Sequence, residues 1–294
     1  RGSLLCTGHN GSYLGFAEVD DQGNWSGFDI EMCKALATAI LGSPDALQII
    51  PVSWAQRFPA LQSGDIDVII KVTGWTMSRD TELGLQYSRP YFIGPTNILA
   101  RTEIGASEPA DLEGGVFCIN AGTSIVRIEA VYMGARGISV EPLNVDNPEE
   151  LRSALTAGRC DALAGFGPFL AATRFNAPNP EDFTILDAVL ALEPEGIAAR
   201  EGDDGFIDVI NWMMSALLMA EEAGITTETC DGGGADGSEQ RVAGRWEVGC
   251  HRPDGTRRTP QETTPDADAS GSPSKPLQSF STGTPGGNPL PPTP

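Results

Sequence analysis

Residues 59–70, PALQSGDIDVII, and residues 153–164, SALTAGRCDALA, repeat one order of residue types. In each segment an Ala-Leu pair is followed, after two intervening residues, by glycine, and aspartate comes three positions after the glycine. This order is typical of a helix that ends at glycine and leads into a buried strand. Its recurrence about ninety residues later, although helix–glycine–strand is also a common connection, favours an α/β fold built from two similar halves.

Alternating strand and helix patterns extend outward from both segments. Strands are expected at residues 4–7, 47–52, 67–71, 116–120 and 160–164, and an extended run at 87–100. Helices are expected at residues 29–42, 55–62, 76–83 and from Asn147 to Gly158. Asp29, Thr76 and Asn147 are candidate N-caps, because their side-chain oxygens can accept a hydrogen bond from the first turn.

Net charge and apolar runs exclude several classes of protein. The formal net charge of −21 makes a nucleic acid an unfavourable partner, because it is a polyanion too. No apolar run approaches the roughly 20 residues that span a bilayer. The N-terminus has no basic segment followed by an apolar one, so we expect any export signal to be missing from this chain.

The six cysteines bear on the cellular compartment. None forms a Cys-x-x-Cys pair, and His9 and His251 stand alone, so neither a zinc site nor a cofactor is expected. Four cysteines lie at expected strand edges or on an expected helix: Cys6, Cys33, Cys118 and Cys160. Two disulfides in an exported protein explain these positions better than four buried thiols in a cytosolic one.

The globular pattern ends near Thr229. Residues 230–294 are rich in glycine and proline and end in GNPLPPTP. Such a composition buries too little apolar surface to offset the entropy of ordering the chain. We expect a disordered tail, either a natural extension or the product of a shifted reading frame.

Several segments together carry a family resemblance. They are SGFDIEMCKALA (26–37), RFPALQSGDIDVII (57–70), GWTMSRDTELGLQYSRPYF (74–92), AGTSI (121–125), AGRCDALAG (157–165), EGIAAREGDD (195–204) and AEEAGIT (220–226). In this order they resemble type II periplasmic binding proteins for amino acids, in particular the general L-amino-acid binding proteins. The resemblance covers residues 4–228.

The resemblance implies two α/β lobes that close on a ligand like a flytrap and are joined by two crossover strands. The crossings would fall near residues 97–101 and 190–196. Lobe 1 would contain residues 1–98 and 193–229, and lobe 2 residues 99–192. The family also pairs cysteines at positions that correspond to Cys6–Cys33 and Cys118–Cys160.

By the same resemblance, Arg79 anchors the carboxylate of the ligand. A guanidinium at the start of a short helix can hold a carboxylate through two hydrogen bonds. Gly74 matches a position that donates a backbone amide, and Thr123 and Ser124 match a turn that completes the carboxylate site. The alternative for Arg79 is a surface ion pair with Asp80 or Glu82.

Three aromatic residues are candidates for the walls of the binding site. Phe16 and Trp54 match family wall positions, and we favour the binding site over the core for both. Trp75 is equally compatible with either place, because aromatic residues in loops before helices are often buried in the core.

The sequence departs from the family where the ligand's ammonium group would bind. The family has an aspartate five residues after the position of Asp161, and here Phe166 occupies it. Val126 and Val72 replace a glutamate and an asparagine. A buried ammonium group without a counter-charge costs several kcal/mol, whereas a cation–π contact with a phenyl ring returns about 0.5–2 kcal/mol. The expected ligand is therefore a carboxylate without a free α-ammonium group, unless binding is much weakened.

The function that follows is solute binding for an ABC-type importer. The chain would act in the periplasm as a monomer, binding an amino acid or small carboxylate and delivering it to permease subunits. No catalytic residue is expected: Glu18, Asp20 and Glu129 are the acid–base candidates, and a lone His9 is more often a surface residue. The alternatives are a ligand-sensing module, a non-binding homologue and a dehydratase of the same fold.

Overall fold

The apolar segment near the N-terminus forms the first strand. The computed structural model describes residues 2–9 and 13–226, and in it Leu4–His9 (β1) pairs in parallel with Leu47–Val52 (β4), the limits predicted for the second strand. Parallel neighbours need a crossover connection. Here the crossover contains a short hairpin, Glu18–Val19 (β2) with Trp25–Ser26 (β3), followed by helix Phe28–Leu41 (α1).

The predicted N-cap of α1 is wrong. Gly27 caps the helix with a φ of 116°, and a Cβ at this position would lie 2.5 Å from the carbonyl oxygen of Phe16. Only glycine tolerates both conditions. Asp29 lies instead in the first turn, where it is fully buried and its carboxylate accepts a hydrogen bond from the Tyr91 hydroxyl at 2.9 Å. The predicted end is confirmed, since Gly42 takes the left-handed C-cap conformation.

The elements after β4 follow the predictions with one exception. Arg57–Ser63 (α2) ends at Gly64, and Met77–Leu83 (α3) is capped by Thr76 as expected. The strand predicted at residues 67–71 is not continuous. Two of its residues instead form isolated β-bridges, each to a different segment. Val68 bridges β1 in parallel and Ile69 bridges Ala198 antiparallel. Leu85–Tyr87 (β5) pairs antiparallel with Ala198–Arg200 (β12).

A six-stranded mixed sheet forms the second group of strands. Its order is β10-β6-β9-β7-β8, with β11 also paired to β6. The strands are Phe92–Arg101 (β6), Val116–Asn120 (β7), Glu141–Val145 (β8), Ala162–Phe166 (β9), Phe183–Ile185 (β10) and Ala191–Glu195 (β11). Successive residues of β6 pack in different hydrophobic cores, because side chains alternate between the two faces of a strand. Ile98 packs in the core that contains Phe117, and Leu99 packs in the core that contains Leu163.

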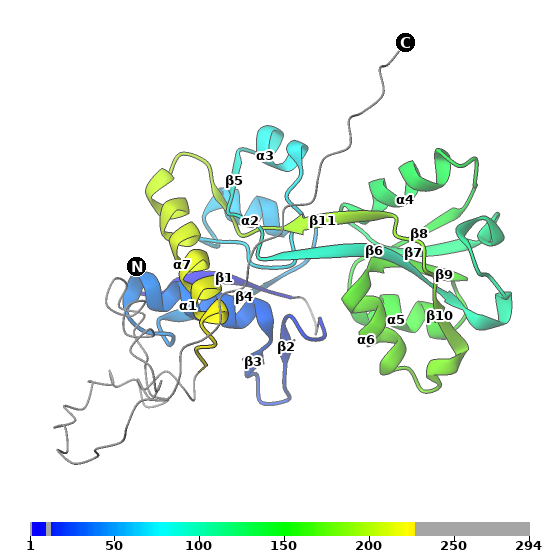
Figure 1. The fold of residues 1–294 in the computed structure, drawn as a ribbon, viewed down its shortest axis with the longest axis horizontal. Helices are drawn as coiled ribbons and strands as arrows, with labels where there is room; N and C mark the ends of the chain where they lie inside the picture. Colours follow the sequence, from blue (N-terminus) through cyan, green and yellow to red (C-terminus); the bar gives the residue numbers. More distant parts are fainter. Residues whose placement is uncertain (1, 10–12, 227–294) are drawn as a thin grey trace, which may run out of the picture. The chain divides into compact units, whose positions relative to one another are not determined.

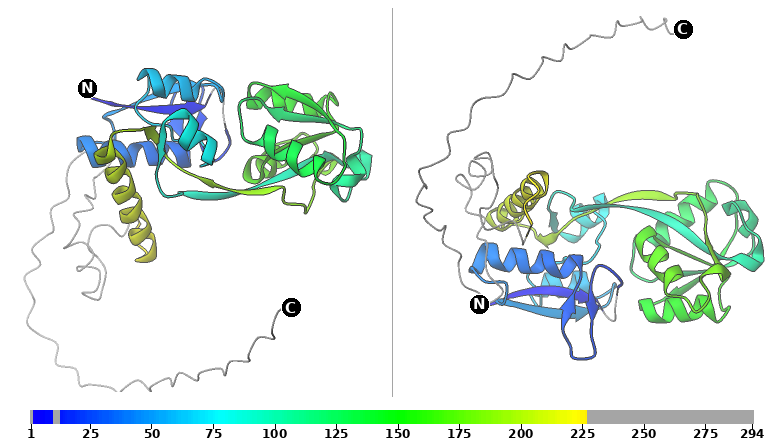
Figure 2. Two further views of the ribbon diagram at one scale, coloured as in Figure 1. Left: turned by 90° about the horizontal axis from the view of Figure 1, so that it is seen from above. Right: turned by 60° about the horizontal axis from the view of Figure 1, so that its bottom comes forward.

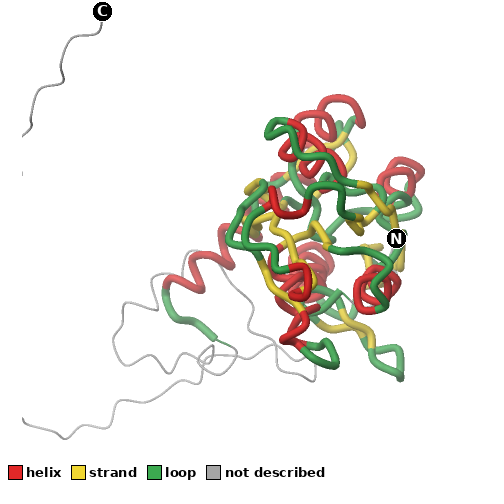
Figure 3. Tube along the Cα trace, turned by 90° about the vertical axis from the view of Figure 1, so that its right-hand side faces the viewer, coloured by secondary structure: helices red, strands yellow, loops and turns green. Residues whose placement is uncertain are grey.

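Helices lie around these strands (Figure 3). They are Ile125–Gly134 (α4), Pro148–Thr156 (α5) and Gly167–Phe175 (α6), and short 3₁₀ turns occupy Thr102–Ile104, Pro109–Leu112 and Pro180–Asp182. The predicted start of α5 is confirmed, since the Asn147 side chain accepts a hydrogen bond from the Glu150 amide at 2.7 Å. The predicted strand 116–120 is confirmed as β7, and the strand predicted at 160–164 begins two residues later.

Two strands connect the two groups of elements. β6 and β11 run antiparallel, with Phe92 opposite Glu195 and Thr96 opposite Ala191 (Figures 1 and 2). Beyond Thr96, β6 pairs with β9 inside the six-stranded sheet. The described residues belong to a single structural unit, so the lobe limits at residues 98 and 192 stay predictions.

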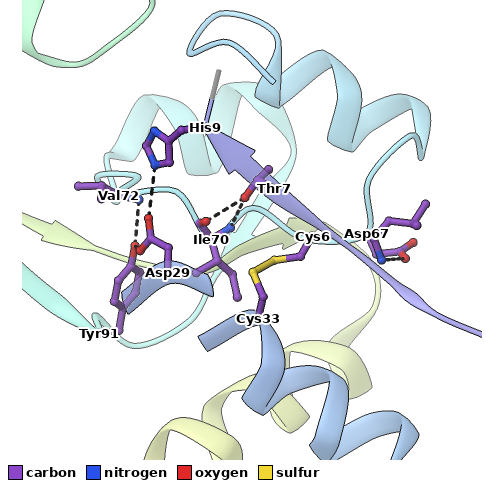
Figure 4. The surroundings of a disulfide bond; sticks show 10 residues. Cys6, Thr7, His9, Asp29, Cys33, Asp67, Ile70, Val72 and Tyr91 are labelled. Atoms are coloured by element: carbon purple, nitrogen blue, oxygen red, sulfur yellow. Dashed lines mark hydrogen bonds and ion pairs between the residues drawn. A yellow bond between two sulfur atoms is a disulfide. The ribbon is translucent and has the colours of Figure 1, made fainter. Parts of the chain in front are cut away.

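Both expected disulfides are present. Cys6 of β1 is bonded to Cys33 of α1 (Figure 4), and Cys118 of β7 is bonded to Cys160, two residues before β9. All four residues are buried. Each bond therefore joins two distant parts of the chain inside one core, which limits the freedom of the unfolded chain more than that of the folded one.

The last described helix, Asp204–Glu222 (α7), covers the first group of strands. Ile207, Ile210 and Met214 pack in one core with Met32 and Leu36 of α1. No helix within residues 2–9 and 13–226 is long and apolar enough to cross a membrane. The predicted tail, residues 230–294, lies outside the described residues.

Candidate functional site

Arg79 is held in place by its own helix and by the loop before it. The Thr76 side chain caps α3 by accepting a hydrogen bond from the Arg79 amide, and an Arg79 guanidinium N–H donates to the Gly74 carbonyl at 2.7 Å. The guanidinium also lies over the Phe58 ring, 5.3 Å from its centroid. Arg79 is therefore a buried, oriented cation with several donors left for another partner.

The alternative of a surface ion pair at Arg79 has no support in the geometry. Among the described residues no carboxylate oxygen lies within 4.0 Å of its guanidinium nitrogens. The Asp80 carboxylate instead accepts a hydrogen bond from the Trp75 indole at 2.7 Å.

A turn before α4 faces Arg79. The Thr123 hydroxyl donates to the Asn120 carbonyl at 2.7 Å, and the Ser124 hydroxyl donates to the Glu193 carboxylate at 3.0 Å. Gly122 has a φ of 72°, and a Cβ there would lie 3.0 Å from the backbone of Ala55. Glycine thus lets this turn approach the loop that carries Trp54.

These elements enclose a small inner cavity. Its volume is about 20 Å³. Its lining consists of Tyr13, Trp54, Arg57, Val72, Arg79, Asn120, Thr123, Ser124, Ile125, Phe166, Glu193 and Glu195. Five of the eight predicted site residues thus meet here: Trp54, Arg79, Thr123, Ser124 and Phe166. Val72, where the resemblance implied an asparagine, lines the cavity as well.

The other three candidates lie outside the lining. Phe16 is buried behind Phe166, with ring centroids 5.3 Å apart. Trp75 is 42% exposed and stacks on Tyr87. Gly74 contacts the lining from outside, because a Cβ at this position would lie 2.7 Å from a Glu193 carboxylate oxygen.

A larger outer groove adjoins the inner cavity. Its volume is about 860 Å³. Residues of α2, α3 and α4 and of the chain before and within β11 line it, including Phe58, Leu83, Arg127, Val131, Tyr132 and Val189. Arg79, Thr123, Ser124 and Glu193 line both spaces, so the predicted carboxylate site lies where the two meet.

The family assignment agrees with this geometry. Residues 5–223 match the model of the bacterial extracellular solute-binding proteins, family 3. The chain belongs to this family. The two-lobed α/β fold of periplasmic binding proteins is likewise shown by the solved structures that it matches.

Named relatives bind amino acids. The general L-amino acid-binding periplasmic protein AapJ of Rhizobium johnstonii is 36% identical over 79% of this chain and 67% of its own length. The glutamate/glutamine/aspartate/asparagine-binding protein BztA of Rhodobacter capsulatus is 35% identical over 77% of this chain and 67% of its own length.

Two solved structures were determined with ligands. A periplasmic binding protein from Brucella ovis with glutathione bound has a TM-score of 0.76 and 35% identity, covering 86% of this chain and 78% of its own. The arginine-bound form of truncated ArgBP from T. maritima has a TM-score of 0.65 and 29% identity, covering 74% and 97%.

Sequence reasoning missed the two carboxylates of this family 3 protein's cavity. Glu193 and Glu195 lie two residues apart on β11, so their side chains leave the same face of the strand. The alternation in EPE (193–195) within the expected crossing strand was a usable signal. Arg57, from α2, was missed as well, and burial lowers the pKa of its guanidinium to about 9.

Several polar atoms of the lining have no hydrogen-bond partner among the described residues. They are Trp54 Nε1, Arg57 Nε, Asn120 Oδ1 and Glu195 Oε2. Leaving a buried polar atom unpaired costs about 1–3 kcal/mol. A cavity with unpaired donors and unpaired acceptors therefore favours a ligand that carries both kinds of group.

His9 is not the surface residue expected from the sequence. It is 1% exposed, stacks on Tyr13 with ring centroids 4.7 Å apart, and places Nε2 3.5 Å from the Asp29 carboxylate (Figure 4). Burial, with the nearby charges of Lys71 and Arg57, holds the pKa of His9 well below its ordinary value. Burial also raises the pKa of Asp29 to about 7. The long-range packing of β1 against α1 creates this environment.

The remaining acid–base candidates do not meet in the cavity. Glu18 accepts a hydrogen bond from the Gly15 amide, and Asp20 holds an exposed turn. Glu129 is buried in α4 and lines neither space. Within residues 2–9 and 13–226 no group of histidine, cysteine and acidic side chains could hold a metal ion.

Proposed function

We propose that this chain is the extracytoplasmic solute-binding component of an ABC-type importer and that it binds an amino acid or a related small carboxylate without turnover. The observation that carries the proposal is Arg79. It is a buried, oriented guanidinium without a carboxylate partner among the described residues, and it faces the turn at Thr123 and Ser124.

The geometry supports a carboxylate as the group that Arg79 holds. Guanidinium–carboxylate pairs are short and can form two parallel hydrogen bonds. The N-terminus of α4 follows the Gly122–Ser124 turn and adds a positive partial charge on the same side. The relatives named for binding amino acids support the same class of ligand.

The proposed location is the periplasm. Disulfides persist in oxidising compartments, and this chain has two buried ones. The relative named as periplasmic supports this location. There the protein would act as a monomer and deliver its ligand to permease subunits in the membrane.

A binding screen on the full chain tests the proposal. The panel holds L-amino acids, the same carbon skeletons without the amine, and glutathione. A ligand present at about a hundred times its dissociation constant adds about 2.7 kcal/mol to the free energy of unfolding. We expect at least one carboxylate to raise the melting temperature and to be recovered unchanged. If none binds, the proposal is wrong, and chemical conversion would instead indicate an enzyme.

A further inference from the structure

The inner cavity has the size of a single small polar group. Its volume of about 20 Å³ gives room for about one water molecule, which is also about the space that an ammonium group needs. The rest of an amino acid does not fit inside it. The space for a larger body is the adjoining outer groove.

Hydrogen-bond acceptors without partners face this cavity. Glu195 is 3% exposed, and its Oε2 atom has no partner among the described residues. Asn120 is 4% exposed, and its Oδ1 atom is likewise unpartnered. The Glu193 carboxylate lies beside them in the lining. An ammonium group has three N–H donors, and the unpartnered oxygens of Glu195 and Asn120 can accept two of them.

Glu195 is fixed in this position by β11. Its carbonyl accepts a hydrogen bond from the Tyr91 amide, and its backbone pairs with Phe92 on one side and bridges to Gly74 on the other. Its side chain therefore leaves a strand that is paired along both edges. Such a carboxylate is preorganised for a ligand.

Phe166 closes one wall of the cavity. Its ring packs against Phe16 and Phe92 and lies over Gly94, where a Cβ would come 1.9 Å from a ring carbon. The counter-charge absent at position 166 is available at position 195, from a different element of the fold.

We propose that the inner cavity receives the ammonium group of an amino-acid ligand whose carboxylate Arg79 holds, and that Glu195 is the counter-charge which selects for that ammonium group. This inference rests on the proposed function of the same site. It differs from the sequence-based expectation of an amine-free ligand. In this arrangement the side chain of the amino acid extends into the outer groove.

The charges around the cavity suit a zwitterionic ligand. The lining contains two guanidinium groups, on Arg57 and Arg79, and two carboxylates, on Glu193 and Glu195. Trp54 Nε1 and Arg57 Nε are unpartnered donors, and Glu195 Oε2 is an unpartnered acceptor. Either half of a zwitterion alone would leave polar atoms of the other kind unpaired.

The titration of Glu195 supports this assignment. Burial, reinforced by the neighbouring Glu193 carboxylate, raises the pKa of Glu195 to about 8. An ammonium group in the cavity would favour the ionised carboxylate, so binding at pH 7 should release a proton. The titratable or charged groups that interact electrostatically with Glu195 are Tyr13, Asp29, Arg57, Arg79, Tyr87, Tyr91 and Glu193.

Calorimetric titration of the full chain tests the proposal with matched ligand pairs. The pairs are L-glutamate with glutarate and L-glutamine with 4-carbamoylbutanoate, which differ only in the amine. We expect the wild-type protein to prefer each amino acid by about 30-fold or more, the effect of a buried charge pair. Glu195→Gln should remove the preference and leave the affinity for the amine-free analogue within about threefold, because Arg79 is unchanged.

Glu129→Gln is the matched control. Glu129 is also a buried glutamate with an unpartnered oxygen, but it lies in α4 outside the lining, so the preference should persist. Titrations in phosphate and in Tris give a second measurement on the wild-type protein, independent of whether Glu195→Gln folds. The amino acid should release a proton that its analogue does not release.

The outcomes separate this inference from the proposed function. If both members of a pair bind equally well, or if Glu195→Gln keeps the preference, the role of Glu195 is wrong while carboxylate binding stands. Proton release that is equal for both members of a pair also overturns the role of Glu195. If neither amino acids nor analogues bind the wild-type protein, both proposals fail.

Discussion

The inner cavity and the outer groove share four lining residues but differ in size and in chemistry. The cavity measures about 20 Å³ and contains buried charges with unpartnered oxygen and nitrogen atoms. The groove measures about 860 Å³, and its lining includes exposed apolar side chains such as Val131, which is 61% exposed, and Val189, which is 47% exposed.

This difference separates two tasks of a binding protein. Buried charges discriminate strongly, because a wrong group leaves them unpaired. An open, partly apolar groove discriminates weakly and tolerates side chains of different sizes. A receptor for several amino acids needs both properties, with strict recognition of the shared groups and loose recognition of the remainder.

The largest expected effect is on the free energy of unfolding of the ligand-free protein, through the buried Glu195 of the cavity. The pKa of Glu195 in the folded protein, about 8, lies above that of an ordinary glutamate, so the folded state binds the proton more tightly than the unfolded state does. Its contribution to the free energy of unfolding is therefore present below about pH 4.5 and lost as the pH rises to about 8. Glu195→Gln should be more stable than the wild type at pH 8, by several kcal/mol, and nearly equal to it at pH 4.5.

Urea unfolding at a series of pH values measures this difference. Asp29 titrates with the same sign in both proteins, since burial raises its pKa to about 7. A constant difference between variant and wild type from pH 4.5 to pH 8 would show that the Glu195 carboxylate is not buried as described.

The second effect concerns the residue where cavity and groove meet. Arg79→Ala should weaken the binding of any amino acid that stabilises the wild type by about 30-fold or more, because truncating one partner of a buried charge pair costs about 2–5 kcal/mol. Arg89→Ala, at an exposed arginine outside both linings, is the control. If calorimetry finds less than a threefold change in the dissociation constant for Arg79→Ala, Arg79 does not bind the ligand.

The third effect concerns the aromatic wall of the cavity. Gly94→Ala would place a Cβ 1.9 Å from the Phe166 ring, so overpacking should lower the free energy of unfolding by about 1–3 kcal/mol. Adding Phe166→Ala should relieve most of the clash, whereas Gly134→Ala, with no atom within 4 Å, should destabilise nothing. Thermal unfolding measures the single and double variants. If their changes in the free energy of unfolding simply add, the packing of Phe166 against Gly94 is wrong.

The smallest effect is expected in the groove. Val131→Ser removes an exposed apolar side chain from the lining, and such surface changes usually alter free energies by less than about 0.5 kcal/mol. Binding should change by roughly twofold or less for every amino acid. A tenfold loss in calorimetry would mean that the groove, rather than the cavity, sets the affinity.

The sequence alone predicted the features that depend on neighbours along the chain. Strand β4, the Thr76 cap of α3 and the Asn147 cap of α5 were all found where they were expected. Caps and turns use donors and acceptors a few residues away, so local residue types determine them. The resemblance to a family added both disulfide pairs.

The tertiary structure decided which charged side chains are buried and which of them meet. The sequence predicted Asp29 as a helix cap and His9 as a surface residue, yet both are buried where β1, α1 and Tyr91 pack together. Glu195 was one acidic residue among 40 in the sequence, and only the pairing of β11 with β6 carries it into the cavity beside Arg79. Burial and the charges of distant residues set its pKa, and these depend on packing across the whole chain, which no local pattern specifies.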